Sequence, residues 1–310
     1  MKKFVRGVIP IMLLISLLTG CPGGEYKIND IRIYKDTPVW ELAQAVKNQD
    51  IKKISQIAER DPKLLDYQDS QYGTTLLFWA VAWEKYDSAE ALLKAGADPD
   101  IISTYEGGTA LYLAAGYSYA DSQAKKDPKY VRLLLDYGAD PNIGFVGNDH
   151  NNMTEIGITP LINSIGCGFE KTKAIVEAGA DINYHTPSGM TAAIKALQLM
   201  KGARKEVSIE VEIMAYAYYL IVEKAASITE PYSIVINNAD SIDAPTHYPV
   251  MLLRQCLPAL DLEGYKYKMA IIGEFARQGV DYWSAEIPND TLVQIQKLYP
   301  DSWEEYIRRY

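Results

Sequence analysis

The side chains best suited to chemistry are few and scattered along these 310 residues. Three histidines, His150, His185 and His247, include no pair at the His-x-x-x-His spacing of a helical metal site. No Gly-x-Ser-x-Gly elbow is present, because the stretch 163–166 reads Asn-Ser-Ile-Gly. A glycine loop ending in Lys-Ser or Lys-Thr, which would cradle phosphate, is also absent from the sequence. We therefore predict no enzyme activity, no catalytic residue, no metal site and no cofactor.

Four aspartates first suggest calcium, but their spacing has another origin. Asp98, Asp100, Asp140 and Asp181 lack the dense alternation of ligands found in a calcium loop. They fall instead inside a five-residue phrase that occurs three times, as Gly-Ala-Asp-Pro-Asp at 96–100, Gly-Ala-Asp-Pro-Asn at 138–142 and Gly-Ala-Asp-Ile-Asn at 179–183. An apolar run typical of a helix precedes each copy. The aspartates are thus predicted to turn the chain at the end of a repeat.

A second signature alternates with this phrase. It reads Gly-Thr-Thr-Leu-Leu at 73–77, Gly-Gly-Thr-Ala-Leu at 107–111, Gly-Ile-Thr-Pro-Leu at 157–161 and Gly-Met-Thr-Ala-Ala at 189–193. Its threonine can cap a helix, and a proline after it fits the first helical turn. The two signatures together resemble the ankyrin repeat. The resemblance implies an all-α helical solenoid with short hairpin loops, built to present a surface to a protein partner.

The spacing of the signatures defines the expected array. They are 23 residues apart in the first unit, 22 in the third and 31 in the second, which leaves room for an insertion around 119–128. Clear units span 73–194, and degenerate units extend the predicted array to 37–285, since terminal repeats must be modified as caps. Residues 286–310 are predicted to form a C-terminal helical cap. In an alternative interpretation, the array ends near residue 230 and a small helical domain follows.

The N-terminus has the features of an export signal. Three basic residues precede an apolar stretch at 8–18, which is too short to cross a bilayer. Leu18-Thr19-Gly20-Cys21 resembles a bacterial lipobox. The resemblance implies cleavage after residue 20 and attachment of acyl chains such as palmitate to Cys21. An ordinary secreted protein is the alternative. We expect a signal peptide at 1–20, a lipidated tether at 21–36 and a protein held in the bacterial envelope by its lipid.

Charge and cysteine content add weaker constraints. The net charge of −9 becomes −12 without the three basic residues of the first twenty, which disfavours nucleic acid and favours a partner with a basic patch. Cys167 and Cys256 are about three units apart in the predicted register, too far for a disulfide, and are predicted to be buried free thiols. Because Pro22 is not the aspartate that resembles an inner-membrane retention signal, the outer membrane facing the periplasm is preferred.

The resemblance also implies where a partner binds. In ankyrin arrays, the hairpin tips and the first helix of each pair line a concave face. Tyrosine and tryptophan are enriched at interface hot spots, and a long loop at 144–155 adds polar groups that a partner can contact. The predicted partner-binding residues are Tyr72, Trp83, Tyr105, Glu106, Tyr117, Asp149, His150, Glu155 and His185.

Two functions fit this combination of anchor and array. The first is an immunity lipoprotein that binds and inhibits a toxic effector in the periplasm, for example a lipase delivered by a secretion system. The second is a constitutive envelope scaffold or adaptor for a resident periplasmic protein. Direct binding of a glycan is a third possibility.

Overall fold

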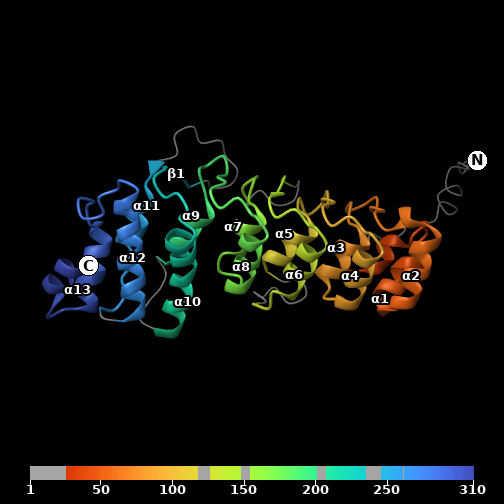
Figure 1. The fold of residues 1–310 in the computed structure, drawn as a ribbon, viewed down its shortest axis with the longest axis horizontal. Coiled ribbons are helices and arrows are strands. Elements are labelled where there is room, and N and C mark those ends of the chain that lie inside the picture. The colour runs from red at the N-terminus through yellow and green to blue at the C-terminus, as the bar shows by residue number, and fades with distance from the viewer. Residues whose placement is uncertain (1–25, 118–125, 148–153, 201–206, 235–245, 261) are drawn as a thin grey trace, which may run out of the picture.

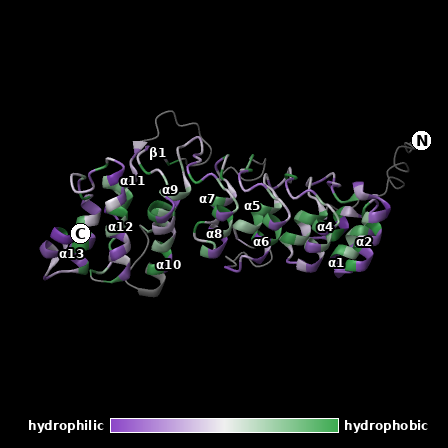
Figure 2. Ribbon diagram, viewed as in Figure 1, coloured by the Kyte–Doolittle hydropathy of each residue, from purple (hydrophilic) through white to green (hydrophobic). Residues whose placement is uncertain are grey.

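The computed structural model describes residues 26–117, 126–147, 154–200, 207–234, 246–260 and 262–310. The chain forms an elongated row of helix pairs, with the N- and C-terminal ends at opposite ends of the row (Figure 1). Helices are amphipathic or apolar and the connecting loops are mainly hydrophilic (Figure 2). Among the described helices, none is long and apolar enough for a membrane span. The predicted all-α helical solenoid is confirmed.

The first helices of the pairs form one layer. Each of α3, α5, α7 and α9 packs against the next helix of this layer. Within it, Thr75, Thr109, Thr159 and Thr191 accept a hydrogen bond from the backbone amide three residues later, at 3.1 to 3.3 Å. The predicted threonine caps are therefore confirmed. The layer comprises α1 (Trp40–Asn48), α3 (Leu76–Ala82), α5 (Ala110–Ala115), α7 (Pro160–Ser164), α9 (Ala192–Met200) and α11 (Pro249–Arg254).

The second helices form a parallel layer, in which α2, α4, α6, α8, α10 and α12 pack in succession. Gly96, Gly138 and Gly179 follow three of them with φ between 87° and 100°, the left-handed conformation that favours glycine. The layer comprises α2 (Ile51–Arg60), α4 (Tyr86–Lys94), α6 (Lys129–Asp136), α8 (Phe169–Glu177), α10 (Val207–Ala217), which continues into the π-helical turn η4 (Tyr218–Glu223), and α12 (Glu263–Arg277).

A continuous series of side-chain-to-backbone hydrogen bonds runs along the array, and we call it the Asx chain. The amide of Asp98 donates to Asp66 Oδ1 at 2.9 Å, and that of Asp140 donates to Asp100 Oδ1 at 2.9 Å. Each repeat thus supplies the acceptor for the first amide of the next turn, as far as Ser227. The aspartates of the recurring phrase have this structural role. The acceptors of the Asx chain are Asp66, Asp98, Asp100, Asp140, Asn142, Asp181 and Asn183.

Helical pairing continues past residue 230. The amide of Ile228 donates to Gln278 Oε1 at 3.1 Å, and Gln278 Nε2 donates to the carbonyl of Ala226 at 3.0 Å. This reciprocal contact joins the segment after η4 to the end of α12, and α12 packs on both η4 and α10, as the second helix of a further repeat would. A short hairpin of β1 (Tyr232–Ser233) and β2 (Thr246–His247), which the sequence did not predict, lies between η4 and α12. Helices α13 (Asn289–Leu298) and α14 (Trp303–Arg309) follow, with a small apolar cluster of their own.

The N-terminal boundary differs from the one predicted. Within the stretch assigned to a tether, residues 31–36 are folded, because the 3₁₀ turn η2 (Ile31–Tyr34) packs on α1. Tyr34 is fully buried and its hydroxyl donates to the carbonyl of Thr74 at 3.2 Å. The apolar side chains of Ile31 and Tyr34 close the open end of the first pair, so a flexible tether ends before them. A second 3₁₀ turn, η3 (Pro62–Leu64), follows α2.

Candidate protein-binding surface

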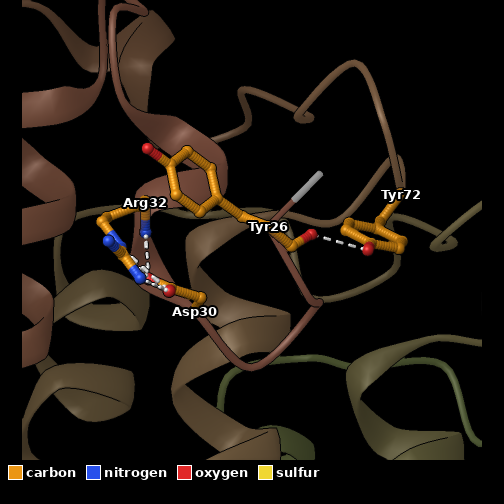
Figure 3. Close-up of polar contacts among 4 residues, drawn as sticks. All are labelled: Tyr26, Asp30, Arg32 and Tyr72. Carbon is orange, nitrogen blue, oxygen red and sulfur yellow. Dashed lines mark hydrogen bonds and ion pairs between the residues drawn. The ribbon is translucent and has the colours of Figure 1, made fainter. Parts of the chain in front are cut away.

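The hairpin tips of neighbouring repeats are held together by backbone and aromatic contacts. The amide of Tyr105 donates to the carbonyl of Tyr72 at 3.0 Å, and the two rings meet edge to face with centroids 4.9 Å apart. Tyr72 is buried, and its hydroxyl donates to the carbonyl of Tyr26 at 2.7 Å (Figure 3). Tyr72 therefore supports the half-buried Tyr105 and has little surface for a partner. The expectation that both rings face a partner is corrected for Tyr72.

The two predicted glutamates also have partners within the array. Glu155 accepts from the amide of Ser188 at 2.7 Å and from its hydroxyl at 2.8 Å, which links two successive tips. The amide of Glu106 donates to Ser103 Oγ at 3.2 Å. Both side chains are half-buried. Glu155 thus fixes the spacing of the tips, while its exposed part remains at the edge of the groove described next.

Tyr117 is the most exposed of the predicted partner-binding aromatics whose surroundings are described, at 60% exposure. It lines a groove of about 550 Å³ that runs across the first-helix layer, together with Tyr112, Glu155, Cys167 and Lys195. The groove brings together α5, α7, α9 and the tips around 155 and 188. Tyr117 and Glu155, which are distant in sequence, therefore belong to one surface.

The backbone before Tyr117 is fixed from two sides. Lys171 is buried, and its Nζ donates to the carbonyl of Gly116 at 3.1 Å. Asn163 Nδ2 donates to the carbonyl of Tyr112 at 2.9 Å. Burial lowers the pKa of Lys171. Because its neighbours are held in place, Tyr117 can bind a partner with little loss of conformational entropy.

Trp83 and His185 line two other hollows. Trp83 lies half-buried at the end of α3, in a hollow of about 980 Å³ next to the N-terminal segment. His185 is exposed beside a hollow of about 350 Å³ that shares Ser188 with the groove. The structure therefore places Trp83, Tyr117 and His185 on three different hollows, and only those of Tyr117 and His185 share lining residues. Asp149 and His150, like Cys21, lie outside the described residues.

The sequence analysis missed several exposed apolar side chains near the tips. Val146 and Ile156 are each 52% exposed, and Ile234, which lines the groove, is 48% exposed. A Cβ atom added to Gly147 would contact Ile156, so Val146 and Ile156 lie close together on the two sides of one hairpin loop. The repeat pattern does not require apolar residues at these loop positions. Their presence there was the signal in the sequence that could have indicated an exposed apolar surface. They extend the aromatic surface of Tyr117 along the tips.

Both remaining cysteines are buried and free, as predicted. Cys167 lies on the groove, where burial raises the pKa of its thiol against the opposing effect of Lys171 and Lys195. A raised thiol pKa disfavours the nucleophilic thiolate. Within the described residues, no group of three or more histidine, cysteine or carboxylate side chains could hold a metal ion. The arrangement of exposed aromatic, apolar and polar groups is suited to binding a protein surface.

Parts of this chain are similar to a known family and to known proteins. The family of ankyrin repeats, in three copies, matches residues 42–145. Protein PhlB of Serratia liquefaciens is 38% identical over 151 residues, which are 48% of this chain and 58% of PhlB. The chain thus covers little more than half of that relative. The crystal structure of EF0377, an ankyrin-repeat protein, overlaps with 77% of this chain and 98% of its own, at 21% identity and a TM-score of 0.47.

Proposed function

From the ankyrin repeats that this chain contains, an architecture of protein-interaction scaffolds, we propose that it is a lipid-anchored immunity protein of the bacterial envelope. It binds a toxic effector in the periplasm, such as a lipase delivered by a secretion system, and covers the effector's active cleft. The Leu-Thr-Gly-Cys sequence at 18–21 supports an anchor on Cys21, and Pro22 supports the outer membrane. The protein acts by occlusion and carries out no reaction of its own.

The proposal rests mainly on one observation: the exposed Tyr117 lies on a groove whose neighbouring backbone is held by hydrogen bonds. Its ring is 60% exposed although the backbone around it is fixed by Lys171 and Asn163. A large ring of this kind contributes much contact area for few rotatable bonds. Exposed Ile234 on the same groove, and Val146 and Ile156 on the hairpin loop that carries Glu155, widen the contact.

The test is crosslinking of the full-length protein in its own envelope, followed by affinity purification and mass spectrometry. Tyr117→Ala is compared with Tyr137→Ala, a control because Tyr137 is exposed at the end of α6, in the second-helix layer. Tyr105→Ala is examined in parallel. We expect one secreted effector, recovered with Tyr137→Ala and lost with Tyr117→Ala.

A sensitivity assay connects binding to immunity. A strain without the gene should become sensitive to a kin competitor that delivers the effector, and the Tyr117→Ala variant should restore protection poorly. Unchanged sensitivity would reject the immunity role. Recovery of an abundant resident envelope protein instead would identify the alternative, a constitutive scaffold or adaptor. Cys21→Ala, followed by labelling with a palmitate analogue and membrane fractionation, tests the anchor.

A further inference from the structure

The hollow at the N-terminal end has a charge opposite to that of the chain. It is lined by four basic residues, Arg32, Lys35, Lys47 and Lys85, and by one acidic residue, Asp30. The whole chain, in contrast, carries a net charge of −9. We call this hollow of about 980 Å³ the N-terminal groove. A local excess of cations in an acidic protein marks a place where an anionic group is favoured.

Asp30, the only carboxylate among the described residues that line the N-terminal groove, is already neutralised. Arg32 Nε donates to both carboxylate oxygens of Asp30, at 3.0 and 2.9 Å (Figure 3). These hydrogen bonds lower the pKa of Asp30, and the charge of Lys47 adds to the effect. The guanidinium of Arg32 also lies 4.6 Å from the centre of the Tyr26 ring. Arg32 and Asp30 thus form a fixed wall.

The three lysines of the groove are uncommitted. Within the described part of the chain, Lys35, Lys47 and Lys85 form no ion pair. Other surface cations of this region do, since Lys53 and Arg60 both pair with Glu41. Three lysines therefore remain available for a ligand.

The floor of the groove holds two hydrogen-bond donors without acceptors. Trp79 is 4% exposed, and its Nε1 and that of Trp83 are enclosed without a partner in the described structure. A buried donor without an acceptor destabilises the folded chain, because it has lost its hydrogen bonds to water. Trp40 adds a third indole ring to the wall. A ligand that brings acceptor oxygens between the rings would satisfy these donors after a small rotation of the indoles.

We propose that the N-terminal groove binds an acidic, extended peptide segment of a protein partner, with its carboxylates at Lys47 and Lys85 and an acceptor oxygen at Trp79. The inference rests on the proposed protein-binding function and specifies the chemistry of the partner at this end of the surface. The net charge of the whole chain predicts a partner with a basic patch. At this groove we expect an acidic partner segment instead. The chain's own N-terminal segment is a poor match for the groove, because residues 21–25, which remain after the proposed cleavage, carry a single acidic residue, Glu25.

The experiment is a titration of fluorescein-labelled octaglutamate with the full-length chain in detergent, followed by anisotropy. Octaglutamine is the neutral control of equal length, and octathymidylate tests a nucleic acid. We expect octaglutamate to bind, octaglutamine not to bind, and octathymidylate to bind more weakly. Lys47→Glu/Lys85→Glu should weaken octaglutamate at least tenfold. The matched control Lys52→Glu/Lys63→Glu, which changes the same charge at exposed positions outside the groove, should change affinity less than twofold.

A second variant separates the donor from the charge. Trp79→Phe keeps an aromatic ring and removes the N–H, so affinity should fall about fivefold, the effect of one hydrogen bond. Trp283→Phe, 50% exposed at the other end of the array, is its control. A Trp79 of purely structural importance would leave the affinity unchanged in a variant that folds, as judged by circular dichroism.

Several results would overturn the proposal. These are equal weakening by the two double variants, equal binding of octaglutamine, tighter binding of octathymidylate, or no octaglutamate binding at about 1 mM, the limit of weak association. The titration involves no effector, so it can fail while Tyr117→Ala still abolishes capture. In that case the groove assignment is wrong and the protein-binding function stands.

Discussion

The ammonium of Lys268 lies 3.4 Å from the centre of the Tyr310 ring and donates to the carbonyl of Cys256 at 2.9 Å. Lys268 is fully buried in α12, with Arg254 and Tyr282 also nearby. Arg254 in turn donates to the carbonyls of Trp283, Ala285 and Tyr310. These contacts attach the C-terminal helices to the last pair of the array. A lysine thereby becomes part of a core, where a charge is costly.

Stability is expected to rise with pH above neutrality. Burial lowers the pKa of Lys268 from 10.5 to about 7, and Arg254 contributes to the same direction. Between these values the unfolded chain binds a proton that the folded chain has released, so the free energy of unfolding increases from pH 7 toward pH 10. Above pH 10 it should fall, because tyrosines such as Tyr282 ionise in the unfolded chain, whereas burial raises their pKa in the folded one.

Urea unfolding at pH 7 and pH 9 tests this expectation. The midpoint should be higher at pH 9 for the parent chain, and Lys268→Met should reduce the difference. Lys266→Met, at an exposed position of the same helix, should leave the difference unchanged. An identical pH response in parent and Lys268→Met would show that Lys268 is charged in the folded protein at pH 7.

A buried serine is expected to stabilise the contact between the first two helix pairs. Ser88 Oγ in α4 donates to the carbonyl of Val46 in α1 at 2.7 Å, and both residues are fully buried. The amide of Gln49 also donates to that carbonyl, so it keeps a partner after substitution. Ser88→Ala should therefore cost about 1 kcal/mol of unfolding free energy. Ser55→Ala, which removes a bond within α2 only, should change it by less than about 0.5 kcal/mol because alanine favours a helix. Denaturant titration measures both, and equal effects would contradict the expectation.

The Asx chain predicts opposite effects for two substitutions at one position. Burial raises the pKa of Asp100, and the charges of Asp98 and Asp140 raise it further. Asp100→Asn keeps an acceptor oxygen for the Asp140 amide and removes this repulsion, so thermal stability should stay constant or rise. The chain itself has asparagine at the corresponding positions 142 and 183. Asp100→Ala loses the acceptor and should cost about 1 kcal/mol. Differential scanning calorimetry distinguishes the two, and a lower melting temperature for Asp100→Asn would mean that the charge itself is required.

Two glycines with similar backbone conformations should differ in their tolerance of alanine. Gly96 and Gly107 have φ of +100° and +71°. A Cβ atom at Gly96 meets nothing within 4 Å, whereas one at Gly107 lies 2.5 Å from the carbonyl oxygen of Gly147. Gly96→Ala should cost about 1–2 kcal/mol for the conformation alone. Gly107→Ala should lower the free energy of unfolding by about 3 kcal/mol, because the clash adds to the cost of the conformation. This value is near the upper end of the range for single substitutions. Similar losses in urea unfolding would indicate that the tip at 147 moves aside.

The repeat pattern predicted most of the fold because its signatures specify local events. Thr109 caps a helix and Gly138 ends one. Both events depend only on residues close in sequence, so they recur in each unit that has the pattern. The roles of other residues depend on contacts between units. Tyr72 is buried because Tyr26 and Tyr105 enclose it, and Tyr26 lies outside any repeat signature. The folding of residues 31–36 onto α1 was missed for the same reason.

The site was less predictable than the fold. Tyr117 was identified by its position after the first helix, since the repeat leaves that position free. Trp79 occupies a regular helical position, and nothing in the sequence indicates that its N–H has no acceptor within the described structure. The basic lining of the N-terminal groove arises from three segments, around residues 35, 47 and 85, which no local sequence window brings together.

The Asx chain runs through the turns that follow the second helices, whereas the extra residues of the second repeat enter between α5 and α6. The turns that hold the Asx chain are thereby separated from the connection that carries this insertion. A segment added between the first and second helix of a repeat leaves every acceptor of the Asx chain in register with the next amide. The connection between the first and second helix of a repeat can therefore change in length while the spacing of the units stays fixed.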